Sequence, residues 1–196
     1  MCREIEEQRY GRNKDTAVNF SYIESGEYRR KFDKIAKEPK LSRLLYQLAK
    51  RMLIHRSGTR YEDMYWVDLD TLEVVAEEIN MNIEESITYS KKTKNAIRRY
   101  RNLMTIHTHP NSYPPSIADM NSSFYNGYVL GLVVCHDGSI YQYCANEKLD
   151  KSYHDLRVAK HKANGYNEIE AQRLELEEIR KRFDVKFQEV TVDDVL

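Results

Sequence analysis

Cysteine is scarce in this sequence. The 196 residues include only three, Cys2, Cys135 and Cys144. An odd number of cysteines with no CxxC spacing argues against both a disulfide framework and a zinc site built from cysteine. We therefore expect three reduced thiols.

Glycine, proline and long apolar runs are also few. Seven Gly and four Pro, with 41% hydrophobic and 32% charged residues, indicate a helix-rich globular chain instead of a collagenous or disordered one. The longest apolar run, residues 128–135, is far below the roughly 20 residues that a membrane-spanning helix needs. The first ten residues are charged and lack the apolar core of a secretory signal. We expect no membrane segment and a cytoplasmic location.

Neither sign of charge dominates the chain. Lys plus Arg and Asp plus Glu both number 31, so net charge gives no general attraction to nucleic acid or acidic membranes. The distribution is uneven, because residues 1–60 carry 15 basic and 8 acidic groups while residues 61–146 carry 6 and 11. The cations within residues 29–37 are either a docking surface for a partner or a solvated helix face. Residues 1–26 are polar and are predicted to form a loosely held arm.

The hydrophobic pattern predicts alternating helices and strands. Leu41, Leu44, Leu45 and Leu48 follow the i, i+3, i+4, i+7 spacing of an amphipathic helix that ends near Gly58. Other helices are predicted over residues 91–102, 116–125 and two parts of 149–183. Strands are predicted over residues 61–69, 74–79, 103–108, 129–135, 140–144 and 185–192. We divide the chain into a basic arm and helix (1–57), a core (58–145) and carboxy-terminal helices with a short tail (146–196).

The most informative stretch is residues 106–119, IHTHPNSYPPSIAD. His107 and His109 are two residues apart at the end of a predicted strand, so both imidazoles lie on the same face. Asp119 falls in the first turn of the following helix, where the intervening loop can fold it back toward the histidines. Two imidazoles and one carboxylate suit zinc and leave a fourth position for water, as in catalytic sites.

Each part of this stretch also has a simpler interpretation. An H-x-H pair by itself is weak support for a metal site. Ser116 and Asp119 form an ordinary helix-capping pattern, S-x-x-D, in which the acid is favoured by the helix dipole. The combination of a strand, H-x-H-P, a proline-rich turn and a capped helix favours the metal site.

This combination resembles the JAMM signature of the JAB/MPN metalloprotease superfamily, and most closely the RadC-type and phage or mobile-element JAB domains of bacteria. The resemblance covers residues 58–145. It implies an α/β fold with a mixed, curved sheet and flanking helices, and hydrolysis of peptide or isopeptide bonds, often to ubiquitin-like tails, with one zinc ion. By this resemblance His107, His109 and Asp119 match the zinc ligands, and Ser116 matches the serine that supports the tetrahedral intermediate. The loop from Pro110 to Ser116 is about one residue shorter than in the family pattern.

The family pattern also includes an upstream glutamate, which we assign to Glu62. It opens a segment that ends in Leu-Asp-Thr, as in the bacterial pattern. A partly desolvated acid beside a metal site is suited to take a proton from water. The alternative interpretation of Glu62 is a solvated acid at a strand edge. Other candidates are Glu73, Glu77, Glu78, Glu84 and Glu85, of which the last four are expected at the surface.

These residues predict a zinc-dependent peptidase or isopeptidase acting on a peptide or protein, with a ubiquitin-like tail as one candidate. The alternative is a non-hydrolytic module that binds DNA or a protein partner through the basic first third and Arg98, Arg99 and Arg101. His154 and His161 are expected at the surface with no acid completing a site. Tyr113 is expected near a substrate groove.

Overall fold

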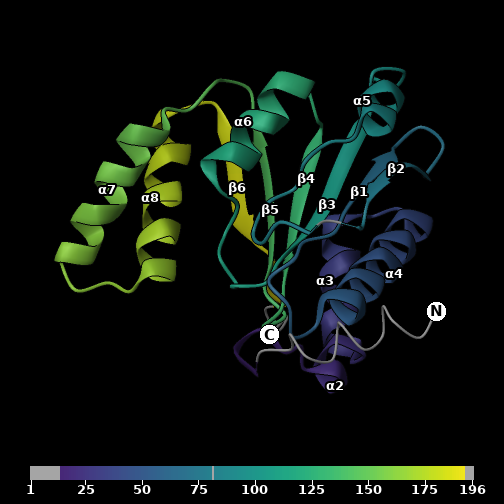
Figure 1. The fold of residues 1–196 in the computed structure, drawn as a ribbon, viewed down its shortest axis with the longest axis horizontal. Helices are drawn as coiled ribbons and strands as arrows, with labels where there is room; N and C mark the ends of the chain where they lie inside the picture. The colour runs from purple at the N-terminus through teal and green to yellow at the C-terminus, as the bar shows by residue number, and fades with distance from the viewer. Residues whose placement is uncertain (1–13, 81, 193–196) are drawn as a thin grey trace.

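The computed structural model describes residues 14–80 and 82–192. In these residues seven α-helices flank one open six-stranded sheet with the order β2-β1-β3-β4-β5-β6 (Figure 1). The strands are β1 (Met64–Asp68), β2 (Glu73–Glu78), β3 (Leu103–His109), β4 (Leu130–Cys135), β5 (Ile140–Ala145) and β6 (Val185–Glu189). The helices are α2 (Phe20–Ile23), α3 (Gly26–Ile35), α4 (Pro39–Arg56), α5 (Lys91–Ile97), α6 (Ile117–Asn126), α7 (Lys151–Ala163) and α8 (Glu168–Arg182). The expected α/β fold with a mixed sheet and flanking helices is confirmed.

The sheet is mixed because one neighbouring pair of strands is parallel. β3 and β4 run parallel, with α6 as the crossover between them, whereas the other four pairs are antiparallel. Ligand sites in α/β sheets lie outside the carboxyl ends of parallel strands. The carboxyl end of β3 carries His107 and His109.

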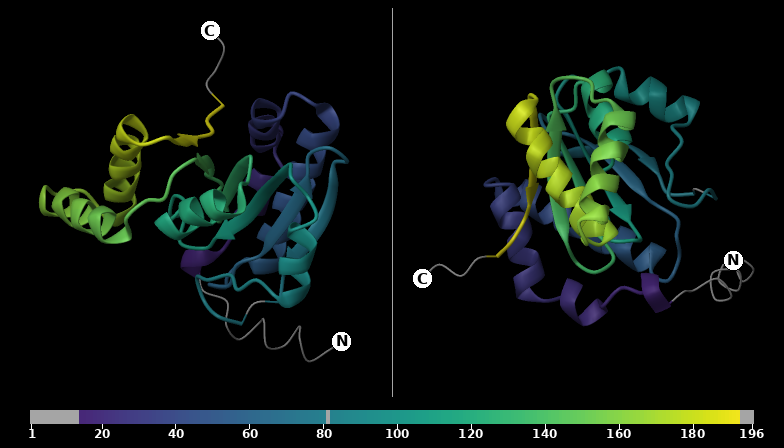
Figure 2. Two further views of the ribbon diagram at one scale, coloured as in Figure 1. Left: turned by 90° about the horizontal axis from the view of Figure 1, so that it is seen from above. Right: turned by 90° about the vertical axis from the view of Figure 1, so that its left-hand side faces the viewer.

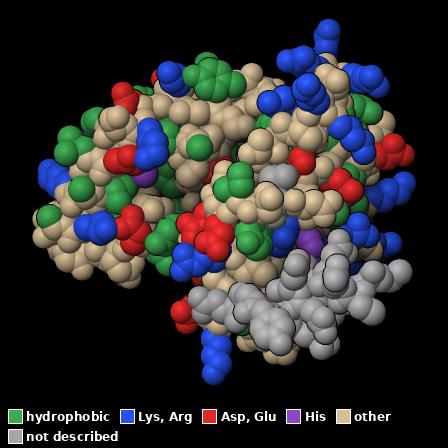
Figure 3. All heavy atoms as spheres, viewed as in Figure 1, with side chains coloured by type: hydrophobic (Ala, Val, Ile, Leu, Met, Phe, Trp, Pro, Cys, Tyr) green, Lys and Arg blue, Asp and Glu red, His purple; other side chains and the backbone are tan. Residues whose placement is uncertain are grey.

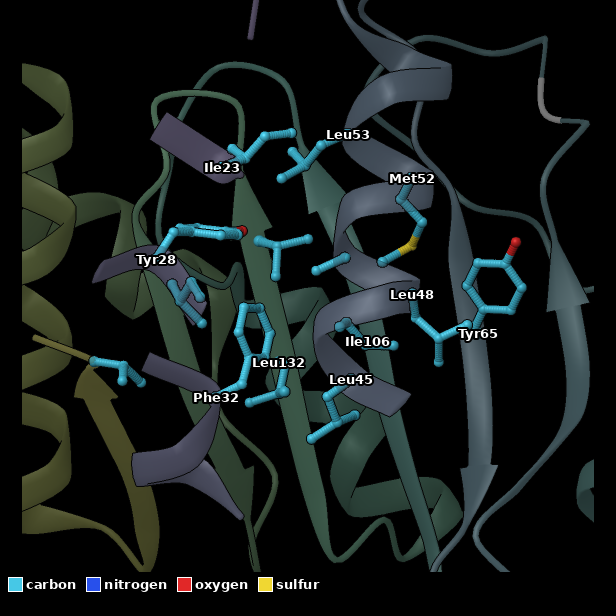
Figure 4. Close-up of a cluster of buried hydrophobic side chains, with 14 of the residues drawn as sticks. Ile23, Tyr28, Phe32, Leu45, Leu48, Met52, Leu53, Tyr65, Ile106 and Leu132 are labelled. Carbon is cyan, nitrogen blue, oxygen red and sulfur yellow. The ribbon is translucent and has the colours of Figure 1, made fainter. Parts of the chain in front are cut away.

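Helices cover both faces of the sheet (Figure 2). On one face, α3 and α4 pack on β1, β3 and β4 in a single buried cluster. Figure 4 shows Phe32 and Leu45 of these helices close to Ile106 and Leu132 of the strands. On the other face, α6 and α8 pack on β4, β5 and β6, while α5 packs beside β1 and β2. The amino-terminal helices therefore share their core with the strands.

The prediction of a loosely held arm over residues 1–26 is wrong for its second half, residues 14–26. Val18 and Ile23 are 6% and 1% exposed and belong to the buried cluster under α4. Burial of each of these two side chains contributes about 1.5–3 kcal/mol, which helps to hold the segment against the core, while Phe20 stays exposed. The first half of the arm, residues 1–13, lies outside the described residues.

The helix predicted over residues 91–102 ends early, at Ile97. Thr93 and Ile97 are its buried residues, and the next position on that face is Arg101, which is exposed. Without a further apolar residue the helix has nothing to pack against the sheet. No helix among residues 14–80 and 82–192 is long and apolar enough to cross a membrane.

Gly131 interrupts the apolar run of β4 for a steric reason. A Cβ at this position would lie 2.2 Å from Cζ of Tyr143, so the tyrosine ring lies directly against the backbone of β4. The same ring packs edge-on against His107, with centroids 6.2 Å apart. The glycine thus leaves room for an aromatic ring that supports a histidine of the candidate site.

We expect Gly131→Ala to lower the free energy of unfolding by about 1–3 kcal/mol, because the methyl group displaces a fully buried ring. Urea denaturation measures the change. Gly26→Ala is the matched control, since a Cβ there meets only ordinary contact, 3.8 Å from Arg30. Equal effects of the two substitutions would show that the ring does not require the glycine.

Candidate metal centre

His107 and His109 converge at the end of β3. Alternation along the strand places both side chains on the face that α6 crosses, and their Nε2 atoms are 3.1 Å apart. His107 is 1% exposed, and its Nδ1 has no hydrogen-bond partner among the described residues. The polar contacts of this ring therefore lie on its Nε2 side, toward His109 and Asp119.

Asp119 reaches the two histidines from the first turn of α6. Its Oδ1 is 3.4 Å from Nε2 of His107, and its Oδ2 is 3.5 Å from Nε2 of His109. The expected capping pattern is confirmed as well: the backbone N and Oγ of Ser116 both donate to Oδ2 of Asp119, at 2.7 Å. The capping box and the metal-ligand interpretation are thus compatible, because the cap fixes the carboxylate that faces the imidazoles.

The spacing of these side chains is close to that of a tetrahedral zinc site. Ligand atoms about 2.0–2.1 Å from zinc in tetrahedral geometry are separated by roughly 3.3–3.4 Å. In the structure the two Nε2 atoms are 3.1 Å apart, and each lies beside a different carboxylate oxygen of Asp119, at 3.4 Å (Oδ1) and 3.5 Å (Oδ2). One ligand atom of each residue lies within 4.8 Å of the others, so a rotation of the carboxylate would let all three residues bind one ion and leave a fourth position free.

The proline-rich loop orients His109. Its Nδ1 lies 2.8 Å from the backbone carbonyl oxygen of Tyr113, which can only accept, so Nδ1 carries the proton. In the neutral ring this leaves a lone pair on Nε2, the tautomer that binds a metal. The same carbonyl accepts a hydrogen bond from Sγ of Cys135.

The electrostatics of the site favour a cation. Burial acts to lower the pKa of His109, but the hydrogen bond to Asp119 and the charges of Glu62 and Asp119 outweigh it and raise the pKa to about 9. Burial acts to raise the pKa of Asp119, but the charges and hydrogen bonds of His107 and His109 hold it well below its usual range. The surrounding carboxylates thus stabilise a positive charge at the position where a metal ion would bind.

Glu62 is buried beside this site. It is 7% exposed and lies two residues before β1. Met64 pairs with His107 in the antiparallel register, and continuing that register brings Glu62 level with His109. Burial raises the pKa of Glu62, although the charges of His109 and His107 act to lower it. The alternative of a solvated acid at the strand edge does not match this burial.

A network that the sequence analysis missed fixes the backbone next to Glu62. Asp63 is 1% exposed and accepts hydrogen bonds from Nε of Arg56 at 2.5 Å and from Nδ1 of His55 at 2.7 Å. Its backbone N donates to Oγ1 of Thr108, at 3.0 Å. The network joins α4 and β3 through the residue just before β1, and no local sequence pattern indicates such contacts between elements.

The other candidate glutamates differ in their exposure to solvent. Glu77, Glu84 and Glu85 are exposed, as expected, and Glu85 pairs with Arg60. The prediction that Glu78 lies at the surface is wrong. It is 7% exposed, and its carboxylate accepts a hydrogen bond from the backbone N of Ser90 just before α5.

Two of the three candidate metal ligands, His109 and Asp119, border a cavity of about 590 Å³. Glu62, His109, Ser116 and Asp119 line it, and Tyr113 contributes as expected from the sequence. Its other walls include residues 85–89, Lys94 of α5, most of the loop at residues 110–114, and Gln172 of α8. This volume is typical of ligand sites.

A second group of potential metal ligands lies between α7 and α8. His161, Glu175 and Glu178 have ligand atoms within 4.8 Å of one another, so the prediction that no acid accompanies His161 is wrong. His154 is also buried, at 8% exposed, and not at the surface. Arg157, however, pairs with both Glu175 and Glu178. Because this guanidinium already neutralises the acids, the group resembles an ion-paired helix contact more than a metal site.

Comparison with protein-family models, curated proteins and solved structures gives no match for this chain.

Proposed function

We propose that this chain is a zinc-dependent amide hydrolase, a peptidase or isopeptidase of the JAB/MPN type that its H-x-H-P and S-x-x-D pattern resembles. One observation carries the proposal. The side chains of His107, His109 and Asp119 converge with ligand atoms within 4.8 Å of one another, and His109 and Asp119 line a cavity that the buried Glu62 also lines. A buried ion-paired cluster made only for stability would not need that cavity.

Each side chain of the candidate site then has a defined role in the proposed hydrolysis. His107, His109 and Asp119 would hold the zinc ion, which when bound would supply Lewis acidity toward water and the substrate carbonyl group. Glu62 takes the proton from the attacking water and passes it to the leaving amine, a role that suits a carboxylate whose pKa is raised by burial.

Ser116 is the proposed donor to the oxyanion of the tetrahedral intermediate. Such a donor contributes about 10²–10³ to the rate. Its hydroxyl donates to Asp119 in the structure, so it must turn toward the cavity to act on substrate. The same residue therefore serves both the helix cap and the reaction.

The alternative of a non-hydrolytic module binding through the basic first third has less support. Lys31 is only 9% exposed, and its Nζ donates to the carbonyl oxygen of Gly138 at 2.8 Å. Arg56 is buried against Asp63, and Lys50 pairs with Glu24. These three cations thus contribute to the fold and are already paired within it.

The test is cleavage of amide bonds by the zinc-loaded protein. The protein is incubated with a peptide library that includes Lys-branched isopeptides, and mass spectrometry identifies new ends. We expect a set of bonds to be cut by zinc-loaded protein, spared after chelation, and cut again when zinc is restored. The proposal would be contradicted if no bond is cut, or if the same bonds are cut in the presence of chelator.

A further inference from the structure

A separate cationic surface lies beside the candidate metal centre. Residues 86–118 contain no Asp or Glu but six Lys and Arg, whereas the whole chain carries 31 of each sign. The six lie on α5 and the turn after it: Lys91, Lys92, Lys94, Arg98, Arg99 and Arg101. We call them the α5 patch. Figure 3 shows Lys and Arg side chains gathered over α5, at the upper right.

The side chains of the α5 patch are free to bind an anionic ligand. All six side chains are exposed, and none forms an ion pair with a described residue. The opposite face of α5 is anchored, because Thr93 and Ile97 are buried against the sheet. Like charges held close together on a fixed helix repel one another, and an anionic ligand relieves this repulsion.

The α5 patch is continuous with the candidate active site. Lys94 lines the cavity that contains His109 and Asp119. Lys91 and Arg98 lie three residues before it and four residues after it, so the three cations form one stripe along the helix. A substrate chain that leaves the cavity past Lys94 meets this stripe.

The surroundings of the α5 patch favour an acidic peptide over nucleic acid. Glu85 shares the cavity with Lys94, and Glu77 shares a groove with Lys92, so carboxylates border the patch on both sides. The seven residues of α5 extend about 10 Å, the length of roughly three extended peptide residues. Nucleic-acid interfaces are larger, about 600–1,000 Å² of protein even for single modules, and the bordering acids would repel a long polyanion.

We propose that the α5 patch binds a short acidic segment of the protein substrate, next to the bond that is cut. The catalytic part of this inference rests on the proposed hydrolase function. The binding part does not, and it can be measured without hydrolysis.

The test is binding of a short fluorescent polyglutamate peptide to the zinc-free chain of residues 1–196, measured by fluorescence anisotropy. We expect binding that weakens as salt rises from about 0.05 M to about 0.5 M. The triple variant Lys91→Glu, Lys94→Glu, Arg98→Glu should weaken it at least about tenfold, because three attractive charges become repulsive.

The matched control changes the same amount of charge on the other face of the sheet, with Lys37→Glu, Lys40→Glu and Arg43→Glu. These three side chains are also exposed, at or near the start of α4. Circular dichroism verifies that both triple variants fold. An equal loss of binding in both variants, or tighter binding of a DNA oligonucleotide of the same charge, would overturn the proposal.

Cleavage separates this inference from the proposed function. If the hydrolase function and the α5 proposal both hold, the zinc-loaded protein cuts bonds that have acidic residues at a fixed distance along the substrate chain. The α5 triple variant then loses this preference for acidic residues. Cleavage without any acidic preference would refute the α5 proposal alone. Peptide binding to the α5 patch with no cleavage would refute the hydrolase alone.

Discussion

Replacing Glu62 with glutamine is expected to lower amide hydrolysis by about 10²–10⁴-fold, the usual contribution of a positioned general base. Glutamine keeps the size and most of the hydrogen-bonding reach of glutamate but cannot accept the proton. Glu62 is not among the three residues whose ligand atoms converge, so zinc content should stay at the wild-type level. Turnover and bound zinc are measured on the same preparation.

Glu85→Gln is the matched control for this substitution. Glu85 lines the same cavity but is exposed and pairs with Arg60. We expect its loss to change turnover little. If Glu62→Gln keeps full turnover on a substrate that His107→Ala cannot cleave, the base is not Glu62.

Replacing Asp119 with asparagine should remove zinc and activity together. A neutral amide is a poor zinc ligand. Loss of a hydrogen-bond partner of a ligand lowers zinc affinity by about 10–100-fold, and loss of the ligand itself should lower it further. The amide oxygen can still accept from Ser116, so the cap of α6 and the stability of the fold should change little. Zinc titration and urea denaturation measure the two quantities.

The control for this substitution uses the second capping box of the same chain. Asn167 and Glu170 begin α8 as Ser116 and Asp119 begin α6, but no group of potential metal ligands among residues 14–80 and 82–192 includes them. Glu170→Gln should therefore leave zinc affinity unchanged. Equal zinc affinity of Asp119→Asn and wild type would exclude Asp119 as a ligand.

The parts of the site that short spacings determine could be predicted from the sequence. Two histidines at i and i+2 on a strand lie on one face, and S-x-x-D at a helix start forms a cap; the structure contains both. The order of strands and helices also follows from local hydrophobic periods. These features need no knowledge of distant contacts.

The missed features depend on contacts between different helices and strands. Asp63 is fixed by residues of α4 and β3, and His161 meets Glu175 only when α7 and α8 fold together. The folding of residues 14–26 depends on the apolar face of α4, which a polar composition does not reveal. Each of these side chains has an ordinary local sequence context, so only the tertiary arrangement identifies its role.

The zinc content of the purified protein tests the central claim most directly. After exposure to zinc and removal of excess metal without chelator, we predict about one zinc per chain in the wild type, almost none in His109→Ala, and about one in His161→Ala. Retention of zinc by His109→Ala with loss from His161→Ala would assign the metal to the α7–α8 contact. A wild-type protein that holds no zinc after this treatment would contradict the metal centre itself.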